Sequence, residues 1–96
     1  MEKRNNNYQL DLKELKLKDG SEGTKHLSLE FDNHDDIFNI IEVIKSKKIF
    51  DDENTSTEFA LGLKLFTEVM LKNKQHPLFE ELRPAIMEFM KKLKSQ

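Results

Sequence analysis

The chain lacks cysteine and tryptophan, and it has only one tyrosine, two prolines and three glycines among its 96 residues. Without cysteine there can be no disulfide, iron–sulfur cluster, thiolate zinc site or cysteine nucleophile. Long apolar runs are also missing, because Asn39 and Glu42 interrupt the most apolar helical segment, Ile37 to Ile44. We therefore expect no membrane span. The N-terminal residues have no apolar stretch behind their charges and do not resemble a secretory signal, so a cytoplasmic location is the default expectation.

An excess of one charge sign is also absent. The chain has 16 Lys and Arg residues against 18 Asp and Glu residues, which leaves a net charge of -2. This balance argues against a strongly basic nucleic-acid module and against a polyacidic arm. Leu, Ile, Val and Phe together make up about 29% of the residues, above the roughly 20% that is typical of disordered chains. The composition therefore predicts a small folded protein.

Alternation of apolar and polar residues predicts an antiparallel β-hairpin over residues 7–31. The alternating apolar residues are Tyr8, Leu10 and Leu12 in the first strand and Leu27, Leu29 and Phe31 in the second. Gly20 and Gly23 fall in the intervening turn. Leu15 and Leu17 follow the opposite phase, so either a β-bulge near Lys13–Glu14 restores one face or the strand changes its buried face. Because two strands alone are marginally stable, the hairpin needs a helical layer on one face, and strands of a second copy could add to its edge.

Helical periodicity predicts three helices, over residues of about 34–48, 56–73 and 77–94. Asn33 is the expected N-cap of the first helix, and a capping box, Thr55-Ser56-Thr57-Glu58, predicts that the second starts near Ser56. The second helix is apolar around most of its circumference, so we expect it to be the most buried, with Gly62 allowing close approach of another backbone.

Two prolines define the last helical segment. Pro77 suits a first helical position, and Pro84 predicts either a kink or a short helix that leads into the last one. The predicted fold is a single α+β domain over residues 1–96, in the order β-β-α-α-α.

The most suggestive polar cluster is Asn33-His34-Asp35-Asp36. Imidazole and carboxylate groups serve as metal ligands and as acid–base groups, so one hypothesis is a small enzyme or a metal- or ligand-binding protein that uses His34, Asp35 and Asp36. The alternative is a helix cap with acids in the first turn, which complement the helix dipole. We favour the cap, because the three histidines show no His-x-x-x-His spacing. We therefore predict no catalytic residue, metal or cofactor.

Lysines at the predicted helix ends form a second candidate. Lys91, Lys92 and Lys94 could contact phosphates, so weak nucleic-acid binding is a further alternative. However, acids gather at the predicted helix starts and lysines at the ends, and dipole complementarity explains that pattern without a ligand. We therefore expect neither a nucleic-acid partner nor a membrane partner.

Three stretches resemble a small bacterial family of unknown function. They are Asn33-His34-Asp35-Asp36-Ile37-Phe38, the segment from Ala60 to Lys72, and Pro77-Leu78-Phe79 with Leu82-Arg83-Pro84 and Phe89-Met90-Lys91. The resemblance implies a bacterial cytoplasmic protein and transfers no catalytic residue. It also implies that certain polar residues belong to the family pattern, and we take them as candidates for an interaction surface: His34, Asp36, Lys64, Glu68, Lys72 and Arg83.

The family pattern includes a stripe on the second predicted helix. Lys64, Glu68 and Lys72 repeat at four-residue spacing, which places them on one side of a helix. This stripe is either a solvated ladder of ion pairs or, together with Arg83, an interaction surface.

The last helix is apolar on more than one side, which makes Phe79, Met87 and Met90 candidates for an exposed patch. With no catalytic constellation and a short sheet, our leading hypothesis is a non-enzymatic protein-interaction module. We expect it to self-associate as a homodimer, and an unknown protein partner is an additional possibility.

Overall fold

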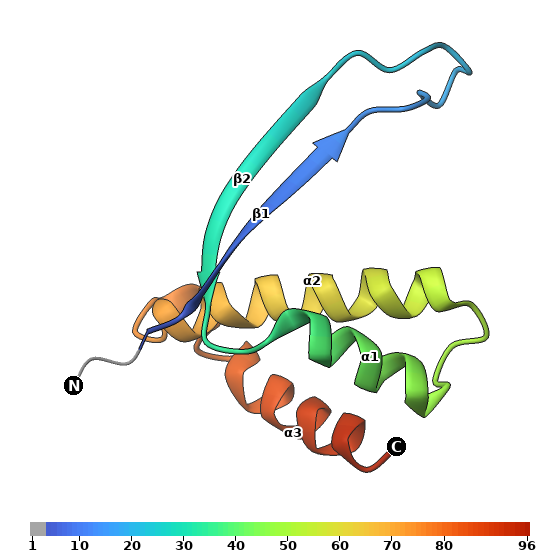
Figure 1. Cartoon of the computed structure of the whole chain (residues 1–96). Helices are drawn as coiled ribbons and strands as arrows, with labels where there is room; N and C mark the ends of the chain where they lie inside the picture. Colours follow the sequence, from blue (N-terminus) through green and yellow to red (C-terminus); the bar gives the residue numbers. More distant parts are fainter. Residues whose placement is uncertain (1–3) are drawn as a thin grey trace. The chain divides into compact units, whose positions relative to one another are not determined.

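The computed structural model describes residues 4–96, and the chain divides into two compact units, Met1–Asp35 and Asp36–Gln96. The first unit contains strands β1 (Asn6–Lys13) and β2 (His26–Asn33). The second contains α1 (Ile37–Lys47), α2 (Glu53–Lys72), a 3-10 helix η1 (Pro77–Phe79) and α3 (Leu82–Lys94) (Figure 1). The prediction of an α+β fold with an antiparallel hairpin followed by helices is thus confirmed.

The hairpin pairs its apolar residues directly across the two strands. Tyr8 lies opposite Phe31, Leu10 opposite Leu29, and Leu12 opposite Leu27, so all six fall on one face of the sheet. The other face is polar, and there the Ser28 hydroxyl donates to Asp11 Oδ1 at 2.6 Å. The predicted strand pairing is therefore confirmed.

The hairpin register shifts by one residue beyond Lys13. Lys13 pairs with His26, but the next bridge joins Lys16 to Glu22, so the returning chain has one residue more than the outgoing chain. Opposite this extra residue lies Glu14, whose Oε1 accepts hydrogen bonds from the backbone N–H groups of Thr24 at 3.1 Å and Lys25 at 3.2 Å. Of our two alternatives, a bulge near Lys13–Glu14 is therefore the one that the structure has, but its extra residue is in the returning chain and not in the outgoing chain.

Both helix starts that we expected from the sequence were wrong by a few residues. The N-cap of α1 is Asp36, whose Oδ1 accepts from Asn39 N at 3.1 Å. Asn33 Oδ1 instead accepts from Asp35 N at 2.9 Å, which makes a turn before the helix. The N-cap of α2 is Asp52, whose carboxylate accepts from the backbone N–H groups of Asn54 and Thr55, so α2 begins at Glu53 and not near Ser56.

The last helical segment is divided, as one of the two alternatives predicted. Pro77 occupies the start of η1, and His76 Nδ1 accepts from Leu78 N at 3.0 Å to cap it. Pro84 is the third residue of α3, where the first N–H groups of a helix have no partner within it. The proline thus costs α3 no internal hydrogen bond.

The core of the second unit lies between its helices. Its buried apolar residues are Ile37, Ile44, Ala60, Met70 and Phe79. Phe59 of α2 joins the segments on either side, with ring centroids 5.3 Å from Phe50 and 6.2 Å from Phe89. Helix α3 contributes no fully buried residue.

Helix α2 has more buried residues than α1 or α3, as expected, but Gly62 does not mark a close approach. A Cβ added at Gly62 would meet nothing within 4 Å, so that expectation was wrong. In the part of the chain that the structure describes, no helix is both long enough and apolar enough to cross a bilayer.

Candidate functional site

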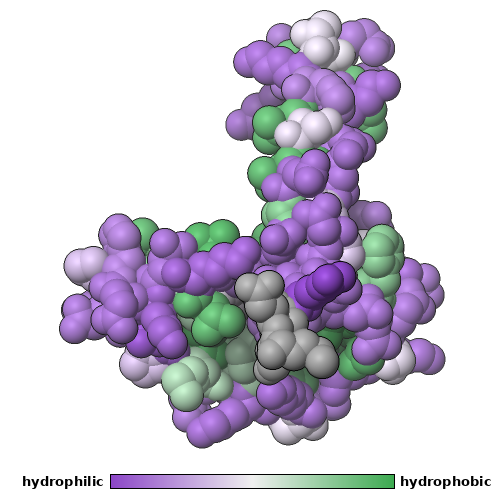
Figure 2. Space-filling model, turned by 60° about the vertical axis from the view of Figure 1, so that its left-hand side comes forward, coloured by the Kyte–Doolittle hydropathy of each residue, from purple (hydrophilic) through white to green (hydrophobic). Residues whose placement is uncertain are grey.

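The apolar face of the hairpin is open to solvent. Leu12, Leu27 and Leu29 are 65%, 59% and 45% exposed, although they share one face of the sheet. Tyr8 and Phe31 extend this face, with ring centroids 5.6 Å apart, and are half-buried. Single exposed apolar residues are normal on a protein surface, but contiguous ones mark contact sites. Figure 2 shows apolar side chains at the surface among a hydrophilic majority.

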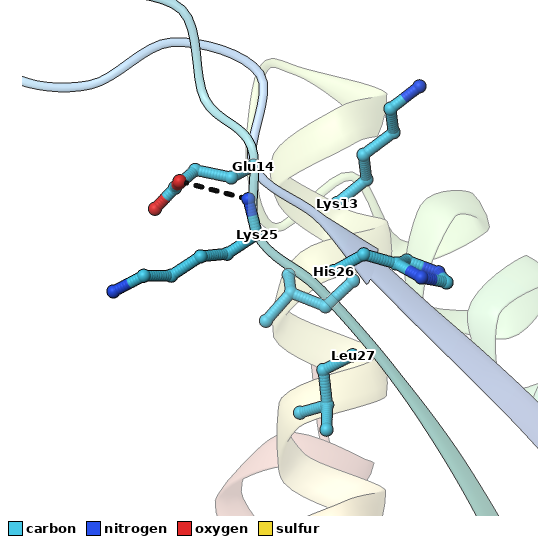
Figure 3. A pocket seen from close by; sticks show the side chains of 6 residues that line it. Lys13, Glu14, Lys25, His26 and Leu27 are labelled. Carbon is cyan, nitrogen blue, oxygen red and sulfur yellow. Dashed lines mark hydrogen bonds between the residues drawn. The ribbon is translucent and has the colours of Figure 1, made fainter.

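A shallow depression of about 620 Å³ lies where this face meets the bulge (Figure 3). Leu12 and Leu27 supply its apolar lining, and Lys25 lies beside them, whereas Lys13 and His26, the next pair in the ladder, belong to the polar face. The carboxylate in this lining, that of Glu14, holds the backbone of the returning chain. The lining thus offers apolar contact beside charged side chains, as a binding surface does.

The predicted cluster at residues 33–36 is dominated by backbone hydrogen bonds. Asn33 is fully buried and closes the turn with Asp35, and Asp36 caps α1. His34 Nε2 lies 3.5 Å from Asp35 Oδ2, and both side chains are partly exposed. Within residues 4–96, no group of three or more His, Asp or Glu side chains could hold a metal ion. The cluster forms the turn and the cap that precede α1, with Asp36 and not Asn33 as the capping residue.

The charged stripe of α2 is partly buried. Lys64 and Glu68 are 9% and 7% exposed, and they continue the buried line of Ser56 and Ala60 at the same four-residue spacing. Lys72 is half exposed, and its Nζ lies 4.0 Å from Glu68 Oε2. The solvated-ladder interpretation is therefore wrong for Lys64 and Glu68, because their charged groups are largely removed from water. A role of this stripe in binding remains a prediction.

Arg83 serves the connection between α2 and η1. Its guanidinium Nη2 donates to the backbone carbonyl of Lys74. Its Nε is buried and has no hydrogen-bond partner among the described residues. Arg83 thus has a local structural contact, and its role in an interaction surface remains a prediction.

The three apolar candidates of the last segment are placed differently from one another. Phe79 is buried, with its ring centroid 6.2 Å from that of Phe66, so it does not form part of an exposed patch. Met87 is 61% exposed. Met90 is partly buried and lines a cavity of about 220 Å³ together with apolar residues of α1 and α2.

Among the described residues, three carboxyl groups have lowered pKa values: one lies in strand β1, one in the hairpin loop and one at the start of α2. The hydroxyl of Ser28, followed by the Gln9 amide, lowers the pKa of Asp11. Ser21 lowers the pKa of Asp19 in the hairpin loop, and the Thr55 hydroxyl lowers that of Asp52 at the start of α2. These hydrogen bonds favour the ionised carboxylates, so the shifts stabilise local structure.

Sequence reasoning missed the hairpin leucines as candidate contact residues. The signal was present, because the alternation that predicts the hairpin also places six apolar side chains on one face. Their solvent exposure depends on what packs against that face, and the alternation does not report this.

The fold and its surfaces define a small α+β protein, and comparison with known proteins gives its family. The family model of a domain of unknown function with a solved structure, DUF3861, matches residues 6–95. The chain is also similar to the 2.20 Å crystal structure of a protein of unknown function from Pectobacterium atrosepticum SCRI1043. The two are 36% identical with a TM-score of 0.83, over 96% of this chain and 99% of that chain. No curated protein matches. The chain belongs to the DUF3861 family, and the predicted resemblance to a family of unknown function is confirmed.

Proposed function

We propose that this chain is a non-enzymatic interaction module that binds a second copy of itself through its β-hairpin. The observation that carries the proposal is the exposed apolar face formed by Leu12, Leu27 and Leu29. A sheet of two strands is only marginally stable in water, whereas three or more strands with an apolar face can be stable. A second copy would supply those strands and remove the leucines from water.

We also propose that the protein is bacterial and cytoplasmic. A relative of the family comes from a bacterium, and the absence of cysteine is compatible with a reducing compartment.

Light scattering after size exclusion tests the proposal with two matched variants. Leu27→Lys places a charge on the apolar face, and Gln9→Lys places the same charge on the polar face, opposite Glu30. We expect a dimer mass for the natural chain and for Gln9→Lys at micromolar concentrations. Leu27→Lys should shift the mass toward the monomer.

Circular dichroism of each variant controls for folding. A monomeric mass of the natural chain at high micromolar concentration contradicts the proposal. So does equal dissociation by the two folded variants, because the effect would then not depend on the apolar face.

A further inference from the structure

We infer that two copies join edge to edge along β2, antiparallel to each other, about a two-fold axis that passes beside Leu29. This inference rests on the proposed self-association and specifies its geometry. It starts from the outer edges of the hairpin. The sheet contains two strands in the order β1-β2 within the described residues, so each strand has one edge without a strand neighbour there.

The two edges differ in how well they are protected against pairing. Natural edge strands carry lysine or proline to discourage the addition of another strand. Both strands carry acidic residues, but only β1 includes a lysine, Lys13, and β2 contains neither lysine nor proline. The β2 edge is therefore the better template for a second copy.

Side-chain chemistry restricts the register of a β2–β2 pair. In a symmetric antiparallel pair, the strands can be centred on a residue, which then lies opposite its own copy, or on the bond between two residues. Only a pair centred on a residue keeps the apolar side chains together on one face, because a slip by one position would place polar side chains opposite apolar ones. Centring on Glu30 would place that carboxylate opposite its own copy, and like charges directly opposite are destabilising. Centring on Ser28 would place Lys25 opposite the partner's Phe31.

Centring on Leu29 avoids both conflicts. Leu27 then lies opposite the partner's Phe31, and Leu29 lies opposite the partner's Leu29. On the polar face, His26 lies opposite the partner's Asp32, and Ser28 lies opposite the partner's Glu30. The apolar residues thus face apolar residues, and His26 faces an acceptor, which are pairs that stabilise adjacent strands; Ser28 is uncharged, so Glu30 does not face a like charge.

The result is an isologous contact that makes a four-stranded antiparallel sheet with the two β2 strands at its centre. Because the same patch is used by both copies, the contact closes at two chains. The apolar stripes of the two hairpins become one continuous face, which meets the strand number and the apolar face that a stable sheet needs.

The absence of cysteine makes this register directly testable by crosslinking. In the Leu29-centred pair, the Cβ atoms of opposed residues lie about 4.5–5.5 Å apart, near the ~3.5–4.5 Å that a disulfide spans. We expect the Leu29→Cys variant to form covalent dimers on mild oxidation, resolved by non-reducing electrophoresis. Leu10→Cys is the matched control, since Leu10 lies opposite Leu29 in the same hairpin but at the centre of β1. It should remain uncrosslinked.

A mixture of two variants tests the register without relying on a single substitution. Leu27→Cys and Phe31→Cys chains should crosslink to each other several-fold more than either does to itself. The mass of the reduced variants from light scattering distinguishes a failure of the proposed self-association from a failure of the β2–β2 geometry. A monomeric protein overturns the proposed function together with this geometry. A dimer in which Leu10→Cys crosslinks as well as Leu29→Cys overturns the β2 geometry alone, and so does a dimer in which the mixed pair shows no preference.

Discussion

Gly23 and Glu14 lie in such close contact that a Cβ at Gly23 would come within 2.5 Å of the Glu14 carbonyl carbon and oxygen. The Gly23 N–H donates to the Leu15 carbonyl at 3.0 Å. The Glu14 side chain binds the next two amides, those of Thr24 and Lys25. Gly23 is therefore the point at which the bulge requires the absence of a side chain.

We predict that Gly23→Ala disrupts the bulge. An extra methyl group against backbone atoms costs about 1–3 kcal/mol when the surroundings must shift. Amide hydrogen exchange should show faster exchange at Thr24 and Lys25 and little change in α2. Thr24→Ala, which removes a side chain beside the bulge, is the control. Unchanged protection of both amides in Gly23→Ala would contradict the close contact.

The strand pairing of the hairpin could be predicted because the alternating pattern is compatible with few registers. A slip of one residue would expose every apolar side chain of a strand, so the pairing of Tyr8 with Phe31 follows from the pattern. The side of the hairpin that carries the extra residue of the bulge could not be predicted in this way. It depends on which side chain can satisfy the unpaired amides, and Glu14 does so across ten residues of sequence.

The helix starts show a second limit of sequence reasoning. Asn33, Asp36, Asp52 and Ser56 all belong to residue types that cap helices, and the pattern does not decide between them. The side chains that cap are Asp36 and Asp52. Asp36 directly precedes the first apolar residue of its helix, and that was the signal present in the sequence.

The candidate site was harder to predict than the fold. Four-residue spacing correctly places Lys64 and Glu68 on one side of α2, but spacing says nothing about what covers that side. Charged residues are rarely buried unless paired, so solvation was the natural expectation. Burial is a property of the packed structure, and the same holds for the open leucines of the hairpin.

Gly62→Ala should stabilise the protein. Gly62 lies inside α2, nothing lies within 4 Å of the position that a Cβ would take there, and its φ is not positive. Alanine is favoured over glycine in a helix interior by about 1 kcal/mol. Urea denaturation followed by circular dichroism should show a higher midpoint. A lower midpoint would mean that another group occupies the space beside Gly62.

Asp52 should make the stability of α2 depend on pH. The Thr55 hydroxyl lowers the pKa of Asp52 from its usual 3.8, so the folded state favours the carboxylate. This contribution is fully present above the pKa of the unfolded chain and is lost as pH falls through the lowered folded value. The melting temperature of the natural chain should therefore fall more steeply below about pH 3.8 than that of Asp52→Asn, which keeps a capping oxygen but does not titrate.

Asp51→Asn is the control for this pH dependence, because the neighbouring carboxylate does not cap α2. Its acid profile should follow that of the natural chain. Identical profiles for the natural chain and Asp52→Asn would contradict the contribution of the cap.

Glu68→Gln should destabilise the protein, because it removes the charge of a buried carboxylate beside Lys72. Glu68 itself is buried whereas Lys72 is half exposed, and weakening the interactions of a buried charged group costs about 1–3 kcal/mol. Glu58→Gln makes the same change at an exposed position of the same helix, where surface substitutions stay within about 0.5 kcal/mol. Free energies of unfolding from urea titrations compare the two. Because the chemistry is matched, equal losses would show that burial of Glu68 has no energetic consequence, whereas a larger loss at Glu68 assigns the buried stripe to stability.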